Sequence, residues 1–297
     1  MRYNKKPITI TEQINCLKKR GLIFNDEQNA QIILNNVSYF RLAGYWRIME
    51  ENHSCRTFRA NSHFEDIVDI YNFDMQLKTL IFIAIQEIEI SVRTRIIQYF
   101  SLAHGPFWFI NNELAINKDL FCDNLGRLRI ELNRSRDEFI AEHFRKYNEP
   151  DIPPAWKTLE LTSFGTLSKL YKNMNDSIVK KQVAHSYNIP QHKCLQSWLA
   201  TITLVRNTCA HHARLWNAHF SMVPRMNDNM RGKWINNYNY YSNKLYPSLC
   251  CILYLLNNIN PQNKFVEDLK SLITKHPNIQ LSMMGFPIGW ENEPLWR

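Results

Sequence analysis

The chain has 297 residues, of which 45% are hydrophobic, so it can bury one large core or two closely packed ones. Its eight glycines are too few for a turn-rich β architecture. Neither G-x-G-x-x-G nor G-x-x-x-x-G-K-[ST] is present, which leaves nucleotide binding by either loop without support. The 36 Lys and Arg exceed the 27 Asp and Glu, and this net charge of +9 favours polyanionic partners such as RNA, DNA or an anionic membrane.

The first half of the chain contains three predicted helical segments. "ITITEQINCLKKRGL" (8–22) begins at a Thr9 or Thr11 cap and ends near Gly21. Residues 26–46 read as a second helix followed by an aromatic-rich turn at Gly44. The strongest helical signal lies within 57–105, where Ser62 is a candidate cap and apolar residues recur at three- and four-residue steps up to Gly105.

The second half continues the helical pattern. Amphipathic segments are predicted at 119–147, at 155–187 in shorter pieces with Gly165 between them, at 194–217, at about 245–258 and at 262–274. Strand alternation is rare, so the predicted fold class is all-α. We expect one compact unit made of an N-terminal helical extension (1–60), a helical core (61–260, with a possible linker at 148–154) and a C-terminal helical tail (261–297).

The cysteines and the apolar runs bear on compartment and cofactors. Seven cysteines at irregular spacing, with no C-x-x-C pair, favour a reducing cytoplasmic location. No Cys/His cluster has the spacing of zinc ligands, and no cofactor is expected. The N-terminal residues lack an apolar signal region, and the apolar runs 80–85 and 249–256 are too short to cross a bilayer, so we expect no membrane contact.

The segment 194–217 carries the most informative polar residues, in "RNTCAHHARLW". If the helix continues to 217, Ile202 marks the centre of its buried face, and Asn207, His211 and Arg214 lie on the opposite face. Arg206 falls at the margin of the buried face, where its charge needs a partner such as Glu87 or Glu89. The simplest interpretation of any one of these residues is a solvated helix face.

The same residue types suit cleavage of RNA without a metal. His can take the proton from a 2′-hydroxyl or give one to the leaving 5′-oxygen, because it titrates near neutrality. Arg offers a permanently charged fork to phosphate oxygens, and Asn can orient the His. One helix supplies one such set, whereas two copies related by symmetry supply an acid and a base.

The string from Arg206 to His211 resembles the R-N-x-x-x-H motif of HEPN ribonucleases. "KPITITEQINCLKKRGL", "SYFRLAGYW", "GPFWF", "PPAWKTLELTSFGTLSKLY" and "SWLATITLVRNTCAHHARLWN" resemble blocks of the Abi-like abortive infection proteins, the AbiD/AbiF group, in the family's order. The resemblance covers roughly residues 6 to 217. It implies a HEPN-like helical bundle, often dimeric, that acts as a toxin-like endoribonuclease in phage defence and is in some members restrained by a small noncoding RNA.

By motif position, the resemblance implies that Arg206, Asn207 and His211 are catalytic. Glu89 matches an acidic position of the long helix, and Arg93, one turn on, can pair with it. His212 and Arg214 belong to the Abi-like extension "HHxRLWN" and are expected to support the site.

Other basic residues are weaker candidates for RNA contacts. Arg41 lies among aromatic residues that suit base stacking, although a packed hydrophobic corner is the favoured interpretation. The cluster at 127–139 contains Arg127, Arg134 and Arg136, for which a solvated helix face is the usual explanation. Two alternatives to the nuclease also stay open: a non-catalytic HEPN protein that binds a structured RNA, and an interaction protein whose helix 194–217 forms a dimer seam.

Overall fold

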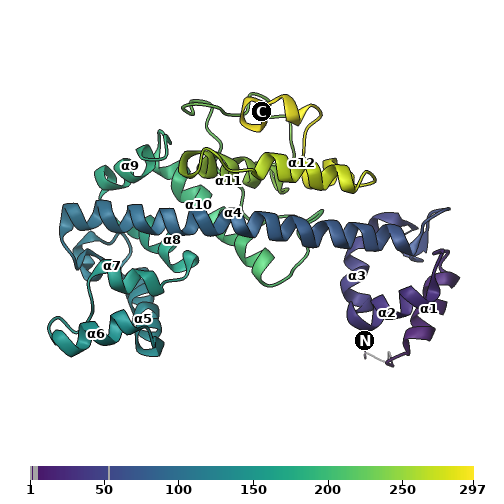
Figure 1. Cartoon of the computed structure of the whole chain (residues 1–297), viewed down its shortest axis with the longest axis horizontal. Helices are drawn as coiled ribbons and strands as arrows, with labels where there is room; N and C mark the ends of the chain where they lie inside the picture. Colours follow the sequence, from purple (N-terminus) through teal and green to yellow (C-terminus); the bar gives the residue numbers. More distant parts are fainter. Residues whose placement is uncertain (1, 3–5, 53) are drawn as a thin grey trace. The chain divides into compact units, whose positions relative to one another are not determined.

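A computed structural model describes residues 2, 6–52 and 54–297; a few residues of the predicted N-terminal extension therefore lie outside it. The predicted all-α class is confirmed, because the described chain is 63% helical, with 12 α-helices and one two-stranded sheet (Figure 1). The chain divides into two compact units, which are described separately below. Unit 1 contains residues 1–79 and 269–280, and unit 2 contains 80–268 and 281–297. The division predicted from the sequence, at residues 60 and 260, stays a prediction.

Unit 1 begins with three short helices, α1 (Ile10–Lys19), α2 (Glu27–Asn36) and α3 (Tyr39–Trp46). The predicted Thr9 cap of α1 is confirmed: the Thr9 hydroxyl accepts from the Glu12 backbone, and the Glu12 carboxylate accepts from the Thr9 backbone. The predicted end at Gly21 is confirmed as well, because Gly21 adopts φ +94 and the Leu22 N–H bonds to the Leu17 carbonyl. The sheet pairs β1 (Glu50–Asn52) with β2 (Thr57–Phe58) in antiparallel orientation.

The aromatic segment around Gly44 was predicted as a turn, and that prediction is wrong. Ser38 caps α3, and the helix buries Tyr45 and Trp46, whose packing outweighs the low helix propensity of aromatic residues and glycine. The Tyr45 hydroxyl donates to Asp74 (2.7 Å), which also pairs with Lys78 at 3.0 Å in the interior of unit 1. The packed-corner interpretation therefore holds for Tyr45 and Trp46, whereas Phe40 is 83% exposed.

The longest helix is α4 (Phe64–His104), and it ends as predicted at Gly105, which has φ +80. The boundary between the units falls within this helix, after Thr79. Its predicted apolar stripe is buried throughout unit 2, as the following residues show: Ile81, Ala84, Ile85, Ile88, Val92 and Ile96.

Unit 2 contains the second half of α4 and most of the remaining helices. These are α5 (Lys118–Arg134), α6 (Glu138–Lys146), α7 (Ala155–Thr158), α8 (Phe164–Asn173), α9 (Ser177–His185), α10 (His192–Ala210), α11 (Tyr246–Ile259) and the first residues of α12 (Phe265–Lys275). Short 3₁₀ turns lie at 47–49, 108–110, 112–114, 159–161, 281–284, 290–292 and 294–296, the first of them in unit 1. Helix α10 packs against α8, α9 and α11 at the centre of unit 2.

Two predicted boundaries in unit 2 need correction. The segment 119–147 is two helices, because the chain is extended at Ser135 and Asp137, where the Ser135 hydroxyl bonds to the Asp137 backbone and carboxylate. Gly165, predicted to separate helices, lies in the first turn of α8, where the Ser163 cap satisfies the neighbouring backbone N–H of Thr166.

Candidate functional site

The R-N-x-x-x-H motif lies at the carboxyl end of α10, and the helix ends inside it. His211 is the C-cap residue, and its backbone N–H bonds to the Asn207 carbonyl at 2.9 Å. The N–H of His212 bonds to Cys209 (3.0 Å) and that of Ala213 to Thr208 (3.0 Å), which is the Schellman pattern of hydrogen bonds. His212 has φ +54 and thus occupies the left-handed position that Gly21 occupies after α1.

This termination corrects the helix predicted to reach residue 217. Arg214 follows the turn and does not share a helical face with Asn207 and His211. Ala213, which an unbroken helix places on the buried stripe, is exposed. Trp216 is buried, but the turn positions it rather than helical periodicity.

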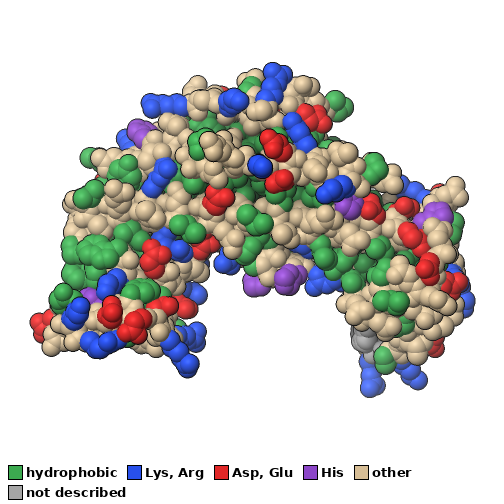
Figure 2. Space-filling view, viewed as in Figure 1, with side chains coloured by type: hydrophobic (Ala, Val, Ile, Leu, Met, Phe, Trp, Pro, Cys, Tyr) green, Lys and Arg blue, Asp and Glu red, His purple; other side chains and the backbone are tan. Residues whose placement is uncertain are grey.

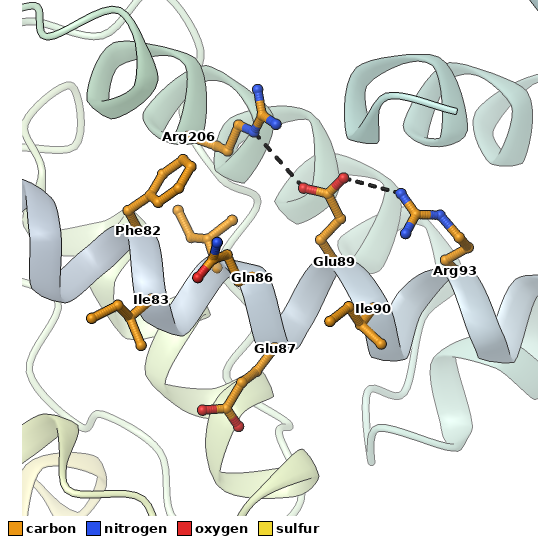
Figure 3. A pocket seen from close by; sticks show the side chains of 9 residues that line it. Phe82, Ile83, Gln86, Glu87, Glu89, Ile90, Arg93 and Arg206 are labelled. Carbon is orange, nitrogen blue, oxygen red and sulfur yellow. Dashed lines mark hydrogen bonds and ion pairs between the residues drawn. The ribbon is translucent and has the colours of Figure 1, made fainter. Parts of the chain in front are cut away.

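Arg206 leaves α10 toward α4, and its charge meets Glu89 as the sequence suggested. The Arg206 Nε lies 3.8 Å from Glu89 Oε2, and its guanidinium lies over the Phe82 ring at 5.8 Å (Figure 3). The other acid considered, Glu87, accepts instead from the Asn260 side chain (3.3 Å). Glu89 is therefore the residue that fixes Arg206 against α4.

Glu89 is shared between two arginines. The Arg93 Nη2 lies 3.1 Å from Glu89 Oε1, so the predicted pairing one turn along α4 is present. Arg93 is buried and also donates to the Thr162 carbonyl (2.9 Å), with Glu160 at 3.9 Å. Arg93 is thus bound by the protein on several sides, and it holds Glu89 through Oε1, whereas Arg206 lies against the other oxygen, Oε2.

The sequence reasoning missed Phe82, Glu160 and Thr162. Phe82 lies seven residues before Glu89, two turns away on the same side of α4, and this spacing could have identified it. The contacts of Arg93 with the segment 160–162 join parts of the chain more than sixty residues apart, which no local pattern reports.

A pocket of about 560 Å³ opens on α4 beside the ion pairs that Glu89 forms with Arg206 and Arg93. Arg206, Glu89 and Arg93 line it together with apolar side chains of α4 (Figure 3). Ile83 is 54% exposed and Ile90 is 63% exposed, two turns apart on one face of the helix. Arg206, which is 32% exposed, is the motif residue that reaches the pocket.

Asn207 and His211 contribute in different ways. The Asn207 Oδ1 accepts a long hydrogen bond from Arg206 Nη1 (3.4 Å), so the two motif residues contact each other. His211 is exposed, and within the described residues its imidazole has no hydrogen-bond partner. An imidazole in this state is accessible to a substrate, but none of the described residues supplies a hydrogen bond that orients it.

The weaker RNA-binding candidates are exposed and belong to elements other than α10. Arg127, Arg134 and Arg136 belong to α5 or the turn after it, and the neighbouring Arg129 pairs with Asp151 at 2.8 Å. Arg41 is exposed on α3 in unit 1. Figure 2 shows basic side chains mixed with acidic ones on the visible face, without one continuous basic patch. None of these four arginines lines the pocket.

Among the described residues, no group of three or more His, Cys, Asp or Glu side chains is arranged to hold a metal ion. No helix in this part of the chain combines the length and the apolar character needed to cross a bilayer.

The fold and the site define an all-helical protein whose R-N-x-x-x-H string ends a central helix and is ion-paired to a long second helix. The profile of the Abi-like protein family matches residues 32–217, more than half of the chain, and the chain belongs to this family. Membership connects the chain with abortive infection, a bacterial defence against phage. Neither the search of curated proteins nor the search of solved structures gave a match.

Proposed function

We propose that this protein is a metal-independent endoribonuclease of HEPN type that acts as a toxin in phage defence. The observation that carries the proposal is the arrangement at the end of α10, where a fixed arginine and an accessible histidine belong to one motif. Arg206 is anchored through Glu89 and lines the pocket, while His211 has no competing partner in the described chain. The expected substrates are phage or cellular transcripts in the cytoplasm.

In the proposed reaction a 2′-hydroxyl attacks the adjacent phosphorus, and the 5′-oxygen departs with a proton. His211 removes the first proton or supplies the second, and general acid–base catalysis of this kind contributes about 10²–10⁴ in rate. Arg206 stabilises the charge that develops on the phosphorane oxygens. Asn207 holds the Arg206 guanidinium through the 3.4 Å contact.

The decisive experiment compares wild type with Arg206→Ala and His211→Ala. We expect both variants to lose cleavage of a total-RNA substrate and to lose toxicity on expression, with activity of the wild type unchanged by EDTA. Sequencing of RNA 5′ ends then maps the cuts. Cleavage that survives both single substitutions contradicts the assignment of the site. Intact RNA after long incubation with wild type, with tight and salt-sensitive binding, supports the non-catalytic RNA-binding alternative.

We also propose that a second copy of the chain completes the site. Each chain supplies one His211, whereas the reaction uses both an acid and a base. The exposed apolar side chains of Ile83 and Ile90 on α4 line the same pocket as Arg206 and suit such an interface. Ile83→Asp with Ile90→Asp should convert a dimer to a monomer in sedimentation and abolish cleavage; a dimer that persists contradicts this interface. A small noncoding RNA, produced beside the gene, is the proposed restraint, and its co-purification with the protein would test this.

A further inference from the structure

The connection between α10 and α11 is a long loop that begins at the motif. Residues 211–245 contain no helix or strand, and irregular segments of this length inside a compact domain are uncommon and usually functional. The charge of the loop is one-sided. Five Lys and Arg residues against a single acid, Asp228, occur between 211 and 245: Arg214, Arg225, Arg231, Lys233 and Lys244.

Hydrogen bonds close this loop on itself near the motif. The Phe220 N–H donates to the Asn243 carbonyl at 2.8 Å. The Lys244 Nζ lies 2.6 Å from Asn217 Oδ1 and 2.9 Å from His219 Nε2. The end of the loop is thereby brought back to its beginning, where the charge of Arg214 acts on Lys244.

Other contacts hold the body of the loop against the helices. Trp234 stacks on Trp198 of α10 with 5.5 Å between ring centroids. The Tyr254 hydroxyl of α11 donates to the Arg231 carbonyl at 2.6 Å. The loop therefore sits on a fixed support, which a binding site requires.

Lys244 differs from the other basic residues of the loop because it is buried. Only 8% of it is exposed, and both of its hydrogen-bond partners are neutral oxygen or nitrogen acceptors. No carboxylate of the described residues lies within ion-pair distance of it, and burial followed by the charge of Arg214 lowers the pKa of Lys244. An ammonium group has three donors, so one remains for an anion.

The position of Lys244 is fixed by close packing with Gly285. A Cβ at residue 285 would lie 2.7 Å from Lys244 Cβ, and Gly285 has φ +86. A buried cation next to a second cation is unfavourable by itself. A bound anion offsets that cost, and the packing keeps the ammonium in place to receive one.

We propose that Lys244, with Arg214 and His219, forms a phosphate-binding subsite for the RNA backbone beside the scissile bond. The proposal rests on the proposed nuclease function, and it assigns the substrate contact of the same site. Arg214 lies three residues after His211, which limits their Cα atoms to about 11 Å apart. Lysine and arginine are the usual donors to phosphate oxygens. The contact between the His219 Nε2 and the Lys244 Nζ (2.9 Å) also holds the ammonium at the subsite.

The test measures binding without cleavage. A fluorescently labelled single-stranded RNA oligonucleotide is titrated with full-length His211→Ala protein, alone and with Lys244→Gln added. We expect affinity to fall about tenfold and the slope of log K against log salt to become shallower by about 1, because one phosphate contact is lost. Lys233→Gln is the matched control: this exposed lysine of the same loop contacts the Arg297 carbonyl, and its loss should change the affinity less than twofold.

Further variants test the same subsite if Lys244→Gln has a melting temperature too low for binding measurements. Arg214→Gln and His219→Asn probe the same subsite, and Gly285→Ala displaces Lys244 while its charge remains. Each should weaken RNA binding by more than Lys233→Gln does. Unchanged affinity and salt slope in folded Lys244→Gln, or in both Arg214→Gln and His219→Asn, overturn the subsite. If RNA binding depends on Lys244 but the wild-type protein cuts no RNA, the subsite stands and the proposed nuclease function is wrong.

Discussion

Glu89→Gln should weaken RNA cleavage by releasing Arg206. The two side chains are 3.8 Å apart, which corresponds to about 4 kcal/mol of Coulomb energy at an effective dielectric constant near 20. Arg206 is 32% exposed, so solvent screening and desolvation reduce the net contribution to about 1–2 kcal/mol. A phosphate-stabilising group displaced by about 1 Å costs up to about a hundredfold in rate, and we expect a loss of 10- to 100-fold.

The same substitution should also lower stability. Arg93 is buried and loses the charge of its partner at 3.1 Å, although the Thr162 carbonyl remains bound to it. We expect a decrease of about 1–3 kcal/mol in the free energy of unfolding, seen as a melting temperature lower by several degrees.

Glu87→Gln is the matched control, because Glu87 lines the same pocket but contacts Asn260 instead of Arg206. Cleavage of a labelled RNA and thermal melting are measured on the three proteins in parallel, at a temperature where all are folded. Cleavage by Glu89→Gln at the wild-type rate, or an equal loss in Glu87→Gln, would refute the anchoring of Arg206 by Glu89.

Three further predictions concern stability. His212→Gly should be more stable than His212→Ala by about 1 kcal/mol in urea unfolding, since residue 212 has φ +54; equal stability of the two contradicts this. Asp74→Ala should lower the free energy of unfolding by about 3–5 kcal/mol, because it removes a carboxylate 3.0 Å from the buried Lys78. The double variant Asp74→Leu with Lys78→Met should recover at least half of this loss, since it leaves no buried charge without a partner. If the double variant recovers none of the loss, the desolvation of Lys78 is not its cause. Burial, and after it the charge of Lys157, lower the pKa of His143. The unfolded chain therefore binds a proton at this residue more readily than the folded chain as pH falls below about 6.5, and the free energy of unfolding decreases there. The melting temperature of His143→Gln should change less between pH 7.5 and 5.5 than that of the wild type, and an equal change in the two proteins refutes this.

Periodicity alone predicted most of the helices. The stripe from Ile81 to Ile96 fixed the course of α4, because buried positions of a helix recur every three to four residues whatever their partners are. Gly21 and Gly105 marked helix ends, since positive φ favours glycine. The motif was legible for the same reason: Arg206, Asn207 and His211 are close in sequence.

The end of α10 illustrates what periodicity does not report. No glycine or proline lies between His211 and Trp216 to mark the end of a helix, and the apolar pattern continues through Trp216. The helix nevertheless ends at Ala210, with His212 in the left-handed conformation. After the turn, Leu215 and Trp216 are buried against the rest of the unit, and this burial stabilises the fold. The stabilisation outweighs the cost of placing His212 in the left-handed conformation, which is of order 1–2 kcal/mol.

The sequence by itself determined the helical class, the main stripes and the motif, because each depends on residues within a few turns of one another. It offered Glu87 and Glu89 equally as partners of Arg206, yet these lie about 200° apart around α4. Only the packing of α10 against α4 selected Glu89. The meeting of Lys244 with Asn217 and His219 was likewise decided by tertiary structure, since it closes a loop of more than twenty residues that has no repeating pattern.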